Sequence, residues 1–173
     1  LDEKRDPDAW VKLRLRLGWV MLCQGRLQDA LAATLKVLGA LALEDEEGPE
    51  HAEVFHAMAL IYSKLGNFPQ ANEFFERSLD LFRSLERTRD AARVLNSMAG
   101  AAMDVPDYPA ALELLGRSME ASAASGDVYS KPMALALRAS AMIRLGRPGD
   151  ARGPLERAIR DAERTSMKYL QAL

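Results

Sequence analysis

The feature that most constrains this chain is a repeat period of about 40 residues, a length typical of repeat proteins that stack helical units. The stretch LGWVMLCQGRLQDAL, which begins at Leu17, aligns with three later stretches so that four alanines fall in register. These alanines are Ala30, Ala71, Ala111 and Ala151, and their spacing is nearly constant. The sequence therefore predicts four copies of one structural unit.

Each unit has the pattern of two helices joined by a short turn. Apolar residues recur at intervals of three and four, stop at a turn that contains glycine or proline, and then resume at the same intervals. The turn residue is Gly25, Gly66 or Gly146 in three units, and Pro106 takes its place in the third. Because the connections are short, neighbouring helices are expected to run antiparallel. We therefore predict an all-α fold of four helix-turn-helix units.

Prolines indicate where several helices begin. Pro69 and Pro109 lie just inside the second helices of units two and three, where a missing backbone N–H costs little. Pro132 predicts a late or kinked first helix in unit four, and Gly153-Pro154 predicts a distorted or delayed second helix. The expected units cover approximately 7–44, 49–86, 88–125 and 128–164, followed by a partial further helix at 166–173.

The chain is interpreted as a single domain over residues 1–173 and as a piece of a longer protein. It lacks an initiator methionine, and it ends within a helical pattern. One helix pair cannot bury its own apolar face, so each pair is expected to pack against the next.

Small residues in register predict where paired helices approach closely. They are Gly18, Ala59, Ala99 and Ala139 in the first helices, opposite the alanine series of the second helices. Larger residues are expected to fill the remaining space, namely Tyr62, Phe75, Leu115 and Leu155. Enlarging one of the alanines would overpack such a contact.

Composition supports a helical protein and argues against several functional classes. Leucine and alanine are abundant while valine, isoleucine and threonine are sparse, which favours helix over strand. With 23 Lys and Arg against 25 Asp and Glu, the formal charge is −2, which argues against direct binding of nucleic acid. No apolar run reaches the roughly 18 residues that span a bilayer, so no membrane partner is expected. The single cysteine is compatible with a reducing compartment, and we predict a cytoplasmic protein.

No catalytic, cofactor or metal-binding pattern accompanies the repeats. His51 and His56 are five residues apart, which turns them roughly 140° away from each other on a helix, and no second cysteine completes a metal site. Cys23 lies in a helical pattern and is predicted to be a small packed residue. The stretch LGRPGDARG lacks the strand context of a dinucleotide site. We therefore expect no enzyme activity, no cofactor and no metal.

These residues resemble the signature of the tetratricopeptide repeat family. The residues that carry the resemblance are Leu17-Gly18, Gly25 and Ala30 in unit one and Met58-Ala59, Tyr62, Gly66, Phe68, Ala71 and Phe75 in unit two. The long repeat period is similar to that of the longer-helix branch, found in G-protein-signalling modulators, kinesin light chains and bacterial regulators. The resemblance covers nearly the whole chain and implies an α-α superhelix, a solenoid whose concave side is lined by the first helices.

The resemblance also implies which side chains line a concave peptide groove. The candidates are Lys12, Leu15, Arg16, Trp19, His56, Leu60, Arg93, Asn96, Met103, Met133 and Ser140. Glu53, Ser63, Gly100, Ala136 and Ile143 complete the same positions. Asn96 could satisfy a ligand's backbone amide and Arg93 could bind a carboxylate; the alternative is that both are solvated surface residues. Trp19 is either a groove anchor or a packed interior residue.

The predicted function is a non-catalytic scaffold that binds a protein or peptide ligand in this groove. In one interpretation, this scaffold is the sensory or regulatory part of a larger protein. Two alternatives stay open. The chain could be a structural segment whose solenoid ends stack into oligomers, or a regulatory domain attached to an enzyme or DNA-binding domain outside this chain.

Overall fold

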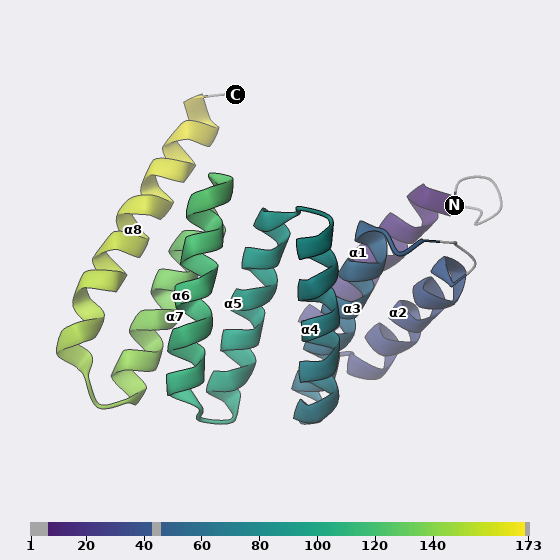
Figure 1. Cartoon of the computed structure of the whole chain (residues 1–173), viewed down its shortest axis with the longest axis horizontal. Helices are drawn as coiled ribbons and strands as arrows, with labels where there is room; N and C mark the ends of the chain where they lie inside the picture. Colours follow the sequence, from purple (N-terminus) through teal and green to yellow (C-terminus); the bar gives the residue numbers. More distant parts are fainter. Residues whose placement is uncertain (1–6, 43–45, 172–173) are drawn as a thin grey trace. The chain divides into compact units, whose positions relative to one another are not determined.

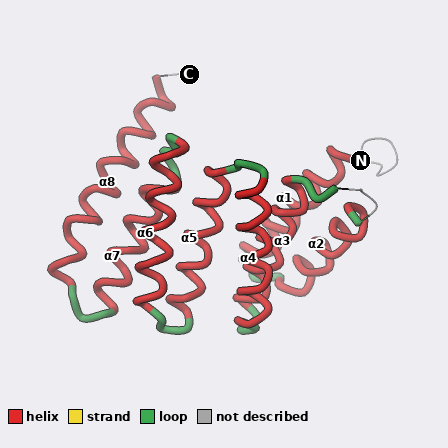
Figure 2. The backbone as a smooth tube through the Cα atoms, viewed as in Figure 1, coloured by secondary structure: helices red, strands yellow, loops and turns green. Residues whose placement is uncertain are grey.

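All regular structure is helical within residues 7–42 and 46–171, the part of the chain that the computed structural model describes (Figures 1 and 2). Eight helices occupy these ranges: α1 (Pro7–Cys23), α2 (Leu27–Leu41), α3 (Pro49–Lys64), α4 (Phe68–Ser84), α5 (Thr88–Asp104), α6 (Tyr108–Ser125), α7 (Ser130–Arg144) and α8 (Pro148–Gln171). They pair in chain order as the hairpins α1–α2, α3–α4, α5–α6 and α7–α8. The all-α fold and its four helix pairs are therefore confirmed, while the predicted end of the first unit at residue 44 lies outside the described residues.

Glycine closes three of the four hairpin turns because the backbone there is left-handed. Gly25, Gly66 and Gly146 have φ of 73°, 78° and 74°, a region that side chains with a Cβ rarely adopt. The residue after each glycine donates its N–H to a carbonyl five residues earlier, as Asn67 does to Tyr62. The third turn makes the same kind of bond, from Asp107 to the carbonyl of Ala102, with Pro106 in place of glycine. The turn is thus specified by its hydrogen bond as well as by its glycine.

The predicted starts of α4 and α6 are confirmed in detail. Asn67 precedes α4 and its Oδ1 accepts from the backbone N–H of Gln70, while Asp107 precedes α6 and accepts from Ala110 at 3.1 Å. Pro69 and Pro109 follow in the first turn of each helix. A side-chain acceptor at this position satisfies an N–H that has no partner inside the helix.

The last hairpin differs from the sequence-based expectation. By the repeat register, α7 would begin at Val128, the counterpart of Thr88, and it begins two residues later at Ser130, as Pro132 predicts. Of the two outcomes expected for α8, a distorted first turn or a delayed start, the delayed start is wrong, because α8 begins at Pro148 and contains Pro154. Pro154 affects the carbonyl of the residue four positions earlier, Asp150, which lies in the first turn and is exposed to water. The separate helix expected at 166–173 is also wrong, since α8 continues without interruption to Gln171.

The chain divides into two compact units, residues 1–86 and 87–173. The boundary falls between the predicted second and third helix pairs, so each unit holds two whole hairpins. No helix in the described ranges has both the length and the apolar character that crossing a membrane requires.

The first unit has a core of large side chains. Its central cluster consists of Trp10, Val11, Val37, Leu41, Val54 and Met58, and Tyr62 and Phe74 pack against it. Phe75 is fully buried, as expected. The expected close approach of α1 and α2 is also found, because a Cβ added to Gly18 would lie 3.3 Å from Oγ1 of Thr34.

Two core clusters of the second unit consist mostly of small side chains. One cluster consists of Ala99, Ala111, Leu115 and Ala134, and a second consists of Ala139, Met142 and Ala151. Leu115 is fully buried because Ala134 of α7 helps to cover it. Leu155 was expected to pack in the same way but is 45% exposed, since no described helix follows α8.

Two buried serines join the helices of the second and third hairpins. The hydroxyl of Ser78 on α4 donates to the carbonyl of Ala52 on α3 at 2.8 Å. The hydroxyl of Ser118 on α6 donates to the carbonyl of Ala92 on α5 at 2.9 Å. Both serines are fully buried, and they occupy equivalent positions in the two repeats.

Candidate peptide-binding faces of the first helices

In the first unit, α1 carries most of the exposed candidate side chains. Lys12, Arg16 and Trp19 are all exposed and follow one another at intervals of four and three, which places them along one side of the helix. Trp19 is 50% exposed, so it is a surface residue and not a packed interior one. Leu15 is half-buried against the core, and Nζ of Lys12 lies 4.0 Å from the carboxylate of Glu50 on α3.

The α3 candidates lie mostly in the interior of the first unit. His56 is only 3% exposed, and its ring lies 6.1 Å from the ring of Phe75. Ser63 is also buried, while Glu53 and Leu60 are half-buried. The exposed surface of these candidate positions in the first unit therefore comes chiefly from α1.

His51 has a structural role at the start of α3. The backbone N–H of Gly48 donates to its Nδ1 at 3.1 Å, so Nε2 carries the proton and faces the carbonyl of Leu41 at 3.2 Å. The side chain therefore joins the end of α2 to the start of α3. Within the described residues, no three His, Cys, Asp or Glu side chains are grouped so that they could hold a metal.

In the second unit, α7 presents a row of exposed side chains. Met133 is 57% exposed and Ile143 is 53% exposed, with exposed Ala136 and half-buried Ser140 between them. Their spacing of three, four and three residues places all four on one side of α7. The structure thus brings together the four positions that the sequence assigned to this helix.

The α5 candidates of the second unit have internal partners. The amide Nδ2 of Asn96 donates to the carbonyl of Ser130 at 2.9 Å and so joins α5 to α7. Asn96 is 7% exposed, and its Oδ1 has no hydrogen-bond partner among the described residues. The guanidinium of Arg93 is partly exposed and lies 3.4 Å from the carboxylate of Asp90. Gly100 and Met103 are half-buried, and Met103 packs against the core.

One position of the repeat shows why the sequence-based prediction assigned buried residues to the surface. Leu15, His56, Asn96 and Ala136 are equivalent in the four repeats, yet only Ala136 is exposed. For Asn96 the cover is visible, because the start of α7 lies against it. Helical periodicity identifies a side of a helix, but it does not show how far the next hairpin covers that side.

The sequence-based interpretation missed an apolar surface on the first hairpin. Leu13, Leu17 and Val20 of α1 are 48%, 39% and 48% exposed, and Leu35 of α2 is 46% exposed. The signal was present, because residues 13, 17 and 20 are apolar at helical spacing. Cys23 is also exposed, which contradicts its assignment as a packed residue. It is the last residue of α1, where the chain leaves the helix for the turn.

Comparison with known families identifies the repeat. A model of the tetratricopeptide repeat matches residues 11–84. A comparison with curated proteins gives no significant match by sequence. Tetratricopeptide repeats generally serve as protein-interaction scaffolds and not as enzymes.

Solved structures show the same fold at low sequence identity. BtubC (BKLC) from P. vanneervenii has a TM-score of 0.76 at 20% identity over 94% of this chain and 66% of its own. PilF from Pseudomonas aeruginosa has a TM-score of 0.68 at 20% identity, over 89% of this chain and 62% of its own. The apo form of RapI has a TM-score of 0.71 at 23% identity, over 91% of this chain and 44% of its own.

A putative kinesin light chain of Podosopora anserina with nearly identical TPR-like repeats has a TM-score of 0.70 at 19% identity, over 90% of this chain and 76% of its own. This chain therefore spans less than two thirds of the length of the first three structures. Residues 11–84 therefore carry the tetratricopeptide repeat signature, and the chain shares the fold of a solved structure with TPR-like repeats along nearly all of its length.

Proposed function

We propose that the chain binds an extended protein or peptide segment on the faces formed by the first helices of its hairpins. The observation that supports this most is the row of exposed apolar residues on α7. Met133 and Ile143 each leave more than half of their surface in water. Exposed apolar residues that share one side of a helix can form an interaction surface.

Positive side chains lie beside the apolar residues and favour a ligand with carboxylates, although Lys12 and Arg93 already lie near Glu50 and Asp90. Arg93 lies on α5, which packs beside α7, and its guanidinium is partly exposed. On α1, Lys12 and Arg16 precede the exposed ring of Trp19 on the same side of the helix. Complementary charge sets the register and the association rate of a bound segment, while apolar anchors provide most of the binding energy. The ligand we propose is therefore an acidic segment with aliphatic or aromatic anchors.

Peptides selected on the full chain from a random displayed library test this function. The affinity of a selected peptide is measured by isothermal titration calorimetry for the parent chain, Ile143→Ser and Ile159→Ser. Ile159 is a matched control, because it is also 53% exposed but lies on α8. We expect Ile143→Ser to weaken binding about tenfold, and Ile159→Ser to leave it unchanged. The same loss in both variants, or in neither, would contradict the proposal, as would a library that yields no binding peptide.

Self-association is a second candidate, supported by a different surface. Leu13, Leu17, Val20 and Leu35 leave an apolar area exposed on the first hairpin. If this area joins two chains, Val20→Glu should convert an oligomer into a monomer, as measured by light scattering over a range of concentrations. A parent chain that is monomeric throughout that range removes this candidate. Attachment to an enzyme or DNA-binding domain stays a prediction, which the full-length sequence would test.

A further inference from the structure

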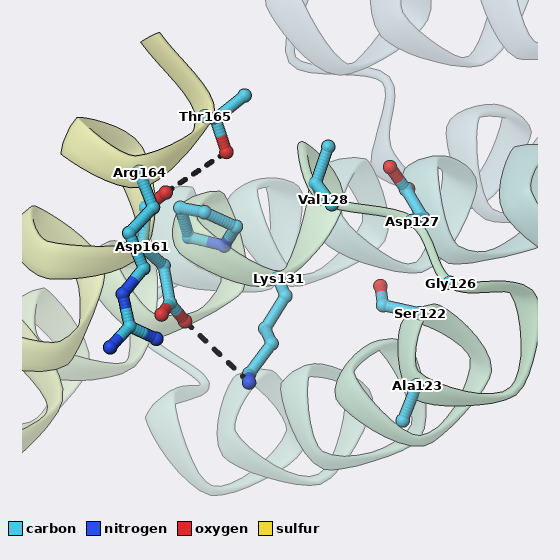
Figure 3. Close-up of a pocket in the computed structure, with 10 residues that line it drawn as sticks. Ser122, Ala123, Gly126, Asp127, Val128, Lys131, Asp161, Arg164 and Thr165 are labelled. Carbon is cyan, nitrogen blue, oxygen red and sulfur yellow. Dashed lines mark hydrogen bonds and ion pairs between the residues drawn. The ribbon is translucent and has the colours of Figure 1, made fainter. Parts of the chain in front are cut away.

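A pocket of about 500 Å³ lies where the end of α6, the start of α7 and the second half of α8 meet (Figure 3). Its volume is within the range of roughly 300–1,000 Å³ that is usual for small-molecule sites. All of its lining residues belong to the second unit, and none of the groove candidates is among them. The pocket is therefore separate from the proposed peptide-binding face.

The repeat register explains why there is space at this point. Ser122 on α6 occupies the position that Leu41 holds in the first repeat and Phe82 in the second. Leu41 is 2% exposed and packs in the core of the first unit, and Phe82 is fully buried. The serine side chain is much smaller than either. A position that holds a large apolar residue in the first two repeats thus holds a small one here, beside the pocket.

The hydroxyl of Ser122 has no hydrogen-bond partner among the described residues, although the residue is only 1% exposed. Buried polar groups are nearly always paired, and leaving one unpaired costs free energy. Ser122 lines the pocket, where Figure 3 shows it on the α6 side. An acceptor oxygen placed in the pocket would supply the partner that the protein itself does not.

Three of the four charged side chains that line the pocket are already compensated. Nζ of Lys131 on α7 lies 3.5 Å from the carboxylate of Asp161 on α8, and Figure 3 shows the two side chains pointing toward each other. The carboxylate of Asp127 accepts from the backbone N–H groups of Tyr129 at 2.9 Å and Ser130 at 3.3 Å. It also lies 3.5 Å from Nε of Arg89. Asp127 therefore holds the start of α7 in place.

The guanidinium of Arg164 remains as the uncompensated charge. It lines the pocket from α8, it is exposed, and it has no ion pair among the described residues. One positive charge favours a ligand with one negative charge, and a guanidinium matches a carboxylate in two-point geometry. A phosphate dianion carries more negative charge than the single guanidinium of Arg164 can compensate. Ala123, Val128 and Pro132 add an apolar wall for a short aliphatic group.

We propose that this pocket binds a small organic carboxylate with a short aliphatic body. Arg164 binds the carboxylate, the hydroxyl of Ser122 donates to one of its oxygens, and the aliphatic part lies against Val128. Such a group occurs at the carboxyl end of a peptide and in a free amino acid. The two sources differ in the amino group, which is an uncharged amide in a peptide and an ammonium in a free amino acid.

Binding is measured on the full chain by the shifts of backbone amide resonances on addition of four probes. N-acetylvaline has the carboxylate and the aliphatic body, N-acetylvalinamide lacks the charge, and valine has the ammonium in addition. Inorganic phosphate is the fourth probe. We expect N-acetylvaline to saturate shifts at residues 122–131 and 161–165, and N-acetylvalinamide to cause none. Tighter binding of N-acetylvaline than of valine would identify a peptide end as the source, and the reverse order a free amino acid.

Two variants and a control locate the site. Arg164→Gln should weaken N-acetylvaline binding about tenfold, whereas Arg157→Gln, an exposed arginine of α8 outside the pocket, should leave it unchanged. Ser122→Leu restores the side chain of the first repeat at this register, and it should abolish binding while the thermal unfolding midpoint stays the same or rises. Equal binding of N-acetylvalinamide, tighter binding of phosphate, or full binding by Arg164→Gln would each overturn the proposal.

Discussion

The two units of the molecule have the same backbone plan but different interiors. In the first unit, the rings of Tyr62 and Phe74 are stacked with centroids 5.6 Å apart, and Phe55 stacks on Phe74 at 6.2 Å. In the third repeat, which belongs to the second unit, the positions equivalent to Phe55, Tyr62 and Phe74 are occupied by Leu95, Ala102 and Leu114. The repeat period is the same on both sides of the boundary at residue 86. The side chains at these equivalent positions, however, are larger in the first unit than in the second.

This difference shows which properties the repeat controls. The small residues in register and the turns reproduce the hairpin in both units, because they set how closely two backbones approach. The large positions only need to be filled, and they can be filled with rings or with aliphatic groups. Where the second unit places a serine instead, at Ser122, the residue lines a pocket. Side-chain volume at a fixed register can therefore vary without changing the fold.

Truncation of a large buried side chain at equivalent positions of the two units should have the largest effect on the free energy of unfolding. Phe75 and Leu115 occupy the same register and are both fully buried. We expect Phe75→Ala to lower the free energy of unfolding by about 4 kcal/mol and Leu115→Ala by about 3 kcal/mol, because the ring removes more buried surface and leaves a larger cavity. Chemical denaturation measures both values. A larger loss of unfolding free energy for Leu115→Ala than for Phe75→Ala would contradict the proposed difference between the two interiors.

A larger side chain at Ala71 tests whether the contact between α3 and α4 has room for extra volume. Ala71 is fully buried between α3 and α4, so Ala71→Leu should cost roughly 2 kcal/mol in unfolding free energy. Ala123→Leu is the control, since Ala123 is exposed on α6. The prediction is wrong if thermal denaturation gives the same midpoint for Ala71→Leu as for the parent chain.

Loss of the buried serine bonds should have a smaller effect that is equal in the two units. Ser78→Ala and Ser118→Ala each remove one buried hydrogen bond, and we expect each to lower the unfolding free energy by about 1 kcal/mol. The two bonds share no residue, so the double variant should lose the sum of the two. Clearly unequal losses would show that the two hairpins are not equivalent at this point.

An exposed ion pair on α8 should have the smallest effect. The hydrogen bond from Arg152, together with its positive charge, holds the pKa of Glu156 below its usual range. A lowered pKa stabilises the fold above the unfolded pKa of the group, and this contribution is lost as the pH falls through the folded pKa. Because both side chains are in water, Arg152→Ala should raise the pKa of Glu156 in an NMR titration without a measurable change in the unfolding midpoint. A lower midpoint at neutral pH would show that surface charge also contributes to the difference between the units.

The hairpins, their turns and their close contacts could be predicted from the sequence because they depend on residues near one another in the chain. Gly66 and Pro69 specify a turn and a helix start through their own backbones. The burial of His56 and Asn96 could not be predicted in this way, because it depends on how neighbouring elements cover each first helix. The pocket at Ser122 was missed for a related reason: the stretch SGDVYS gave the signal of a polar turn, and only the register comparison with Leu41 and Phe82 shows a missing side chain.

The serine bonds of the second and third hairpins have a consequence for motion. At the same register, the first hairpin has Val37 and the fourth has Ala158, neither of which can donate a hydrogen bond. Sliding α4 along α3, or α6 along α5, would break a buried bond, whereas the outer hairpins lack this restraint. Backbone amides of α1–α2 and α7–α8 should therefore exchange with deuterated water sooner than those of α3–α6.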